Sequence, residues 1–390
     1  MNNPPEWSVR LSELDFGSEE IQRVVDVLES EWLTMGPETE AFEAAFARFL
    51  DVKHAIAVTN GTAALHLAHH VMDIGPGDEV IVPSLTFIAT ANSVLYTGAT
   101  PVFSDVTGTH DFNIDPDDIE RRITPRTKGI AVLHYAGYPA DMDRIQSIAR
   151  RHGLYVVEDA AHAPGSMYKG RKLGTIGDVG CFSFFPNKNM STGEGGLVVT
   201  NDDRLAERIR RARSHSMTSL TWDRVRGHAN SYDVLDLGFN YRIDEVRAAM
   251  GHAQLERLES NNNRRKVLME KYLTGLLECS MIKVPFEPAD GTFAFHLCPL
   301  LLAEEVDRAV FMSGMKERGI QTSIHYPPVH LFSYYIDRFG FQEGMLPVTE
   351  MITGREVTLP LYPGMSEGDV CRVVTALEET IAAGAVQEGI

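Results

Sequence analysis

From residue 38 onward, hydrophobic positions alternate between helical spacing in some segments and short continuous runs in others. In the segment 38–50, Phe42, Phe46 and Phe49 lie four and three residues apart, which places them on one face of an amphipathic helix. The next run, H-A-I-A-V-T at 54–59, is short and apolar, as expected of a buried strand. The alternation continues and predicts helices over 61–72, 86–96, 115–123 and 142–151, and strands over 79–83, 101–105, 129–134 and 154–158.

Strands of continuous valine, isoleucine and leucine character, separated by helices, predict an α/β fold with a mainly parallel sheet covered on both faces. A polar segment without clear periodicity follows over 214–242; a segment of this kind is either functional or disordered, and both interpretations stay open. A long helix is then predicted over 244–272. Because 390 residues exceed the size at which one hydrophobic core stops growing, we expect two domains, a large one over 1–250 and a small C-terminal one over 251–390.

Composition narrows the classes of partner. The net charge of −18 opposes binding to nucleic acid and to anionic membranes, both of which need a basic surface. Four scattered cysteines without a C-x-x-C motif favour packing in a reducing compartment over disulfides or zinc. The first ten residues have no apolar run typical of a signal peptide, and the most apolar run, 293–303, is too short to cross a bilayer. We therefore expect a cytoplasmic protein with no membrane or nucleic-acid partner and no metal.

Three residues between 157 and 196 combine into a set that would hold pyridoxal phosphate. Asp159 ends an apolar strand, Lys188 lies on a turn after a second one, and Ser183 interrupts a run of aromatic residues. This cofactor needs a lysine that forms a Schiff base, an acid for its pyridine nitrogen and donors for its phosphate. Taken singly, each of these residues has an alternative interpretation: Asp159 as a helix N-cap, and Lys188 as a solvated lysine on a turn. The glycines at 193, 195 and 196 favour a close approach of backbone instead.

Further candidates follow the strands at 54–59, 79–83 and 154–158. Gly61 and Thr62, at the start of a predicted helix, form a candidate anion site, although the motif taken alone favours a simple turn with a threonine N-cap. Phe87 begins the next helix and is a candidate to stack on a pyridine ring, with core packing as the alternative. His162 is placed to reach the same ligand, or else fills the interior.

These motifs resemble the DegT/DnrJ/EryC1/StrS family of pyridoxal-phosphate-dependent aminotransferases. The central likeness is E-D-A-A-H-A followed by S-F-F-P-N-K-N-M-S-T-G-E-G-G. It extends over nearly the whole chain, through W-L-T-M-G-P, N-G-T-A-A-L, P-S-L-T-F, H-Y-A-G-Y-P-A-D-M, G-F-N-Y-R-I-D-E-V-R-A-A-M-G, I-H-Y-P-P-V-H and L-P-L-Y-P-G-M-S. The resemblance implies fold type I, with a large domain built on a mainly parallel mixed sheet between helices and a smaller C-terminal α+β domain.

The resemblance also implies roles for individual residues. Lys188 would be the internal aldimine lysine, Asp159 the partner of the pyridine nitrogen, His162 a neighbour of the ring hydroxyl and Phe87 the stacking ring. Asn240 would reach the phosphate of a second subunit, so the active site would be shared within a homodimer. The phosphate would be held by Thr62, Ala63 and Ser183, with Gly61 in the same loop, and His325 would lie near the sugar.

The leading hypothesis is therefore an aminotransferase that moves an amino group, from L-glutamate by family likeness, to a keto group of a nucleotide-diphosphate-linked sugar. Two alternatives stay open: a keto-cyclitol substrate of an aminoglycoside-type pathway, and a non-catalytic regulatory protein that keeps the fold. A branch of the family with histidine at the lysine position deoxygenates sugars, and Lys188 argues against it. Desulfuration would need a reactive cysteine on an exposed loop, whereas Cys181 lies in an apolar strand.

Overall fold

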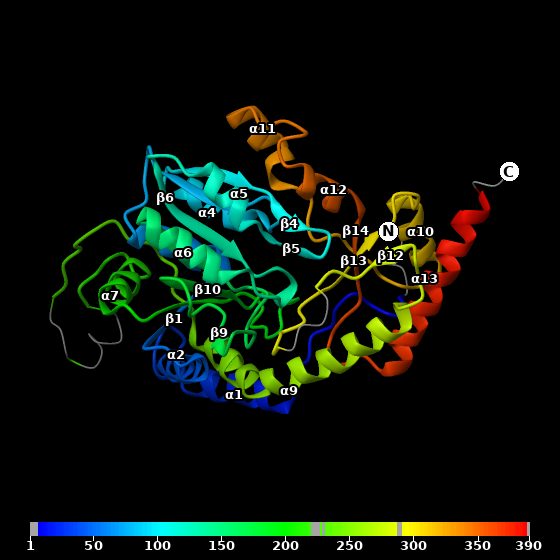
Figure 1. Ribbon diagram of the computed structural model, residues 1–390. Coiled ribbons are helices and arrows are strands. Elements are labelled where there is room, and N and C mark those ends of the chain that lie inside the picture. Colours follow the sequence, from blue (N-terminus) through cyan, green and yellow to red (C-terminus); the bar gives the residue numbers. More distant parts are fainter. Residues whose placement is uncertain (1–6, 220–226, 228–230, 287–290, 388–390) are drawn as a thin grey trace.

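The computed structural model describes residues 7–219, 227, 231–286 and 291–387 and is built around one seven-stranded sheet (Figure 1). Its strand order is β1-β11-β10-β7-β6-β2-β3. Only β11 is antiparallel to its neighbours; the other six strands are mutually parallel. The predicted mainly parallel sheet is thus confirmed. The strands are β1 (His54–Val58), β2 (Glu79–Pro83), β3 (Thr100–Ser104), β6 (Thr127–Leu133), β7 (Tyr155–Asp159), β10 (Val179–Ser183) and β11 (Gly196–Thr200).

Helices cover both faces of this sheet because alternate strand residues supply two apolar surfaces. Ala55 and Ala57 of β1 belong to one core cluster, and Ile56 and Val58 belong to the other. The first face is covered by α2 (Pro37–Leu50), α5 (Pro116–Arg122), α6 (Met142–His152) and the start of α9 (Glu245–Leu276). The second face is covered by α3 (Gly61–Val71), α4 (Ile88–Tyr96) and α7 (Asp203–Ala212). The helices expected at 38–50, 61–72, 86–96, 115–123 and 142–151 are all present.

The long helix α9 leaves the large sheet and runs toward a second, smaller core (Figure 1). There β12 (Ile282–Lys283), β13 (Cys298–Leu302) and β14 (Glu356–Leu359) form an antiparallel sheet. Two helices, α10 (Arg308–Glu317) and α13 (Glu367–Gln387), pack with it, as expected of an α+β region. Val9 from the N-terminal segment joins this small core and bridges to Ile320. The predicted domain boundary at 250/251 falls inside α9 and stays a prediction.

The remaining elements are short or lie outside the two sheets. Helix α1 (Ser18–Glu29) packs along α9. None of the helices that the structure describes is long and apolar enough to cross a membrane. The other elements are the hairpins β4 (Val106–Gly108)–β5 (Asp111–Ile114) and β8 (Met167–Tyr168)–β9 (Arg171–Lys172), the helices α11 (Ser333–Phe339) and α12 (Pro347–Arg355), and two 3₁₀ turns, Tyr135–Gly137 and Val329–Leu331.

A buried carboxylate fixes the sheet edge next to the candidate site. Glu158 in β7 is fully buried and accepts hydrogen bonds from the amides of Gly174, Ile176 and Gly177 at 2.8, 2.6 and 2.5 Å. His134 Nε2 contacts the same carboxylate at 2.9 Å. Burial alone would raise the pKa of Glu158, but these donors outweigh it, and its pKa lies below the ordinary value. Glu158 therefore anchors the loop 173–178 to the strand that ends at Asp159.

We expect Glu158→Gln to lower the free energy of unfolding by about 2 kcal/mol or more, because it removes the buried carboxylate to which these groups donate and leaves amide donors unsatisfied. Urea denaturation at pH 7 measures the change. Since the folded pKa of Glu158 is depressed, the stability that its carboxylate contributes is present above the unfolded pKa and is lost as the pH falls through the folded value. The free energy of unfolding of the variant should therefore depend less steeply on pH in the acid range.

The matched control is Glu120→Gln. Glu120 is paired with Arg151 on the surface, where both side chains are about half exposed. Such exposed ion pairs contribute roughly 0–1 kcal/mol. Equal losses in both variants would contradict the anchoring role of Glu158.

Candidate active site

A cavity of about 350 Å³ lies at the carboxyl ends of the parallel strands. It is bounded by the β1–α3 loop, the start of α4, the end of β7, and the end of β10 with the turn that follows it. Ligands of open α/β sheets bind at this edge. Seven of the predicted site residues line the cavity together: Gly61, Thr62, Phe87, Asp159, His162, Ser183 and Lys188.

Lys188 and Asp159 are titratable residues of opposite sign that line this cavity. Burial lowers the pKa of Lys188 to about 8, although Asp159 works in the other direction. Burial also raises the pKa of Asp159, while hydrogen bonds from Thr90 Oγ1 at 2.7 Å and the Ala161 amide at 3.2 Å favour its ionised form. The N-cap interpretation of Asp159 is wrong, because no helix begins at this point in the structure. Thr90, which orients Asp159, was not identified from the sequence.

The N-terminus of α3 and the end of β10 form a cradle suited to a phosphate. Asn60, rather than Thr62, is the N-cap of α3, and its Oδ1 accepts a hydrogen bond from the Ala63 amide at 2.8 Å. The amides of Gly61 and Thr62 belong to the first turn, where a helix has no internal acceptors. A Cβ at position 61 would lie 2.8 Å from Ser183 Cβ. Ser183 therefore approaches the helix start only because residue 61 is glycine.

Ala63 is buried and does not line the cavity, and its amide is already bound to Asn60. Its predicted role in phosphate binding stays a prediction.

A second close approach of backbone lies beside the loop that starts α3. A Cβ on Gly196 would lie 2.5 Å from the Asn60 carbonyl. The backbone close approach expected of the glycine-rich segment is thus present between β11 and this loop.

Aromatic side chains form another wall of the cavity. Phe87 is 53 % exposed, so the alternative of core packing is wrong for this residue. Its ring centroid lies 5.8 Å from that of Tyr326. His162 Nε2 and Tyr326 Oη share a hydrogen bond of 3.0 Å, whereas His162 Nδ1 is buried and has no partner among the described residues. Burial holds the pKa of His162 well below its ordinary value, so the ring is neutral.

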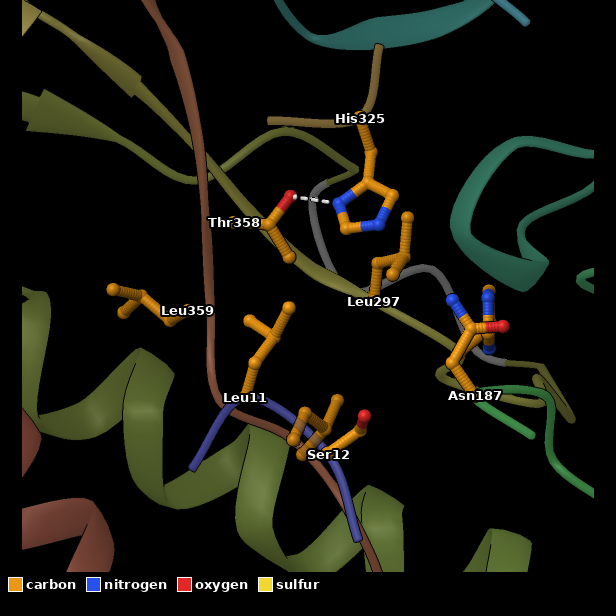
Figure 2. A pocket seen from close by; sticks show the side chains of 9 residues that line it. Leu11, Ser12, Asn187, Leu297, His325, Thr358 and Leu359 are labelled. Atoms are coloured by element: carbon orange, nitrogen blue, oxygen red, sulfur yellow. Dashed lines mark hydrogen bonds between the residues drawn. The ribbon is translucent and has the colours of Figure 1, made fainter. Parts of the chain in front are cut away.

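Two predicted site residues lie elsewhere. Asn240 is exposed and does not line the cavity. His325 lines a second, much smaller cavity of about 20 Å³, where its Nδ1 contacts Thr358 Oγ1 at 3.0 Å (Figure 2). Its neighbour Tyr326 lines the large cavity in its place. Successive side chains of an extended segment point to opposite sides, which separates the two neighbours in I-H-Y-P-P.

The residues present fit pyridoxal phosphate. The cavity offers a lysine of lowered pKa, a carboxylate, a helix N-terminus beside a serine hydroxyl, and an imidazole nitrogen that no described residue contacts by a hydrogen bond. Its volume lies within the range of about 300–1,000 Å³ that small-molecule sites occupy. Among the residues that the structure describes, no group of three or more histidine, cysteine, aspartate or glutamate side chains could hold a metal ion.

Comparison with known proteins identifies the family of this chain. The model of the DegT/DnrJ/EryC1/StrS aminotransferase family matches residues 15–378. The chain belongs to this family. It is 42 % identical to the spore coat polysaccharide biosynthesis protein SpsC of Bacillus subtilis over 370 residues, which cover 94 % of this chain and 95 % of SpsC.

Solved structures agree with this assignment. Helicobacter pylori PseC, an aminotransferase involved in the biosynthesis of pseudoaminic acid, superposes with a TM-score of 0.90 at 28 % identity, covering 97 % of this chain and 100 % of PseC. The putative sugar aminotransferase Spr1654 of Streptococcus pneumoniae, in its PMP form, gives a TM-score of 0.90 at 28 % identity and covers 98 % of this chain and 100 % of Spr1654. A PLP form of Spr1654 is also known. The protein is therefore a pyridoxal-phosphate-dependent aminotransferase of fold type I, and the regulatory alternative is set aside.

Cys181 lines the cavity of this aminotransferase but is buried in β10. Burial raises the pKa of its thiol well above the ordinary value, so the nucleophilic thiolate is suppressed. The expectation that cysteine-dependent desulfuration is foreign to this site is consistent with that environment.

We expect Gly61→Ala to weaken cofactor binding at least tenfold, or about 1.4 kcal/mol, because the added methyl group would meet Ser183. Absorbance titration of the cofactor-free protein with pyridoxal phosphate measures the dissociation constant. The control is Gly354→Ala in α12, where a Cβ meets nothing within 4 Å. Unchanged affinity in Gly61→Ala would show that the cradle between α3 and β10 does not hold the phosphate.

Proposed function

We propose that the protein transfers the amino group of L-glutamate to a keto group of a nucleotide-diphosphate-linked sugar. The observation that carries the proposal is the placement of Lys188, with its lowered pKa, in one cavity with Asp159 and the α3 cradle. The relatives support a sugar as acceptor, since SpsC is named for polysaccharide biosynthesis and PseC for the biosynthesis of pseudoaminic acid.

In this proposal each side chain has a separate task. Lys188 is the nucleophile and, once released, the base that moves a proton at the substrate carbon; its lowered pKa gives it a larger neutral fraction at pH 7–8 than an ordinary lysine has. Asp159 would hold the pyridine nitrogen in its protonated form, and Thr90 keeps the carboxylate oriented. When bound, pyridoxal phosphate supplies an electron sink for carbanion charge.

The remaining residues bind and orient. Ser183 and the first amides of α3 would hold the phosphate, His162 would lie at the ring hydroxyl, and Phe87 would cover one ring face. Because Phe87 and Phe185 are both exposed large hydrophobic residues at this cavity, we assign them also to the entry side, where the sugar arrives. Tyr326 closes the site from the segment that precedes β14.

We further propose a homodimer in which Asn240 completes the site of the other subunit. The side chains of Phe239 and Tyr241 both lie against His66 of α3. The two aromatic rings stack with centroids 5.0 Å apart, the Phe239 ring centroid lies 4.7 Å from that of His66, and Tyr241 Oη contacts His66 Nδ1 at 3.0 Å. Asn240, between them in an extended segment, is directed away from α3 and outward. Bonds from His215 N to Phe239 O and from Tyr241 N to Arg213 O hold the segment in place. A fixed, outward-directed amide suits a partner's phosphate.

The amino-donor half-reaction is tested by absorption spectroscopy. We expect the protein loaded with pyridoxal phosphate to show a visible band that shifts to the near-ultraviolet on addition of L-glutamate, because the cofactor takes up the amino group. Lys188→Ala should show neither the lysine-dependent band nor turnover. A screen of keto sugars with and without a nucleotide, and of keto-cyclitols, then identifies the acceptor. Lys188→Ala behaving as wild type would refute the catalytic assignment.

The shared site is tested by mixing two inactive variants, Lys188→Ala and Asn240→Ala. In a mixed dimer one site carries both substitutions and the other carries neither. Random reassociation after unfolding and refolding together should therefore restore activity to about one quarter of the sites. Each variant refolded alone is the control. Absence of recovery, with mixed dimers verified by mass spectrometry, would place Asn240 in the site of its own chain.

A further inference from the structure

The segment that carries Tyr326 runs beside β14, and its backbone pairing with that strand ends before the tyrosine. Ser323 and Thr358 exchange both backbone hydrogen bonds, at 3.2 and 2.8 Å. An antiparallel ladder continued in this register would next pair His325 with Glu356. The His325 amide instead donates to the side chain of Glu356, to Oε2 at 2.9 Å. A carboxylate therefore takes the place of a backbone acceptor at this step.

Side chains from both cores hold the two backbone polar groups of His325. Its amide is bound by Glu356 of the small sheet, and its carbonyl accepts a hydrogen bond from Tyr135 Oη, just after β6 of the large sheet. Both of these side chains belong to residues that are only 1 % exposed. A buried carboxylate binds an amide more strongly than a neutral oxygen does, because the bond is charge-assisted. Two buried side chains, rather than a β ladder, therefore fix the position of His325.

The residue that follows, Tyr326, forms part of the wall of the large cavity. Its Oη lies 3.0 Å from His162 Nε2, and its ring centroid lies 5.8 Å from that of Phe87. Consecutive residues share one rigid peptide unit. A displacement of the backbone at His325 therefore moves the tyrosine relative to both of these site residues.

We propose that Glu356 is a positioning residue of this aminotransferase, which holds the backbone of His325 so that Tyr326 stays against His162 in the cofactor cavity. Glu356 lines neither the large cavity nor the small one beside His325, so it acts through the His325 peptide and not by contact with a ligand. The last link, from His162 to the cofactor, rests on the proposed function, which places this histidine at the ring hydroxyl.

The charge of Glu356 makes this hold dependent on pH. Burial raises the pKa of Glu356 to about 7, although hydrogen bonds from its neighbours and the charge of Arg308 favour the ionised form. The titratable groups around the carboxylate are Arg308 of α10, the His325 ring (linked to it through Thr358, Figure 2), Tyr135 and Tyr326. Loss of the negative charge weakens the bond to the His325 amide, so Tyr326 is held more firmly above neutral pH than below it.

The position of Tyr326 is tested by carbon-13 NMR of the full chain with its 12 tyrosines labelled at Cζ, where the chemical shift reports the hydrogen bond of the hydroxyl. The signal missing from Tyr326→Phe assigns the residue. We expect this signal to follow pH with a midpoint near 7 in the wild type and to lose that transition in Glu356→Gln, which keeps an acceptor but not the titrating carboxyl. In Glu356→Leu, which removes the acceptor, the signal should shift or broaden at every pH.

An unchanged Tyr326 signal in folded Glu356→Leu, or a wild-type midpoint in Glu356→Gln, would overturn the proposal. The glutamine variant decides the question alone if the leucine variant does not fold. Because the folded pKa of Glu356 is raised, its ionisation costs folding free energy above the unfolded pKa. Glu356→Gln should therefore melt no lower than the wild type at about pH 8, and a change at Tyr326 in this variant is not a sign of unfolding.

The link to the cofactor is read from the visible absorption band of the protein loaded with pyridoxal phosphate. The pH midpoint of this band should shift by about half a unit or more in both Tyr326→Phe and Glu356→Leu, because the surroundings of His162 change. The control is Glu304→Gln, which removes an 82 % exposed carboxylate next to Arg355 and should alter neither the band nor the Tyr326 signal. A displaced Tyr326 signal with an unshifted band would overturn the placement of His162 at the ring hydroxyl and leave the positioning of Tyr326 by Glu356 supported. Neither readout depends on the amino donor or on the sugar.

Discussion

The active site depends on the insertion of one antiparallel strand, β11, between β1 and β10. Because β11 is antiparallel to β10, the chain can return directly across the carboxyl edge of the sheet through residues 184–195, whereas a parallel neighbour would need a crossover connection. The β10–β11 connection places Lys188 over that edge and brings Gly196 against the loop that starts α3. The backbone contact requires residues without side chains at 61 and 196, so the cradle and the lysine are consequences of a single strand pairing.

Burial then acts on the titratable groups of the site in a consistent direction. It lowers the pKa of Lys188 and His162 and raises that of Asp159, so each group is pushed toward its neutral form. A site in this condition gains most from a ligand that brings its own charges, such as a pyridinium and a phosphate. Fixed partners limit the cost: Thr90 orients Asp159, and the Glu158 anchor holds the strand beneath it.

The sequence predicted the α/β core well because its strands are buried on both faces and its helices alternate with them at clear spacing. Phe42 and Phe46, expected on one helical face, are both fully buried, and α2 begins within one residue of the predicted start. Motif spacing also singled out Asp159, Ser183 and Lys188, and the structure brings all three into one cavity because they lie at or after strand ends on one edge of the sheet. Local chain order was sufficient to predict that they lie together.

Residues that depend on long-range packing were not predictable in this way. Tyr326 and His325 are neighbours in one motif, and only the placement of the small core determines that the tyrosine faces the large cavity. Thr90 contacts Asp159 across 69 positions of sequence, and Asn60 rather than Thr62 caps α3, although both have capping side chains. Hydrophobic periodicity carries no information on such pairings.

The small core is accordingly part of the active site rather than an appendage to it. Tyr326 forms one wall of the large cavity, and the backbone amide of His325 is held by the carboxylate of Glu356 at 2.9 Å. The chain of amides from Pro164 through Asn262 and Asn189 to His296 reaches the same place from the large sheet. These bonds join α9, the turn that carries Lys188 and the segment before β13, so that turn is bonded both to the long helix and to the segment that leads into the small core.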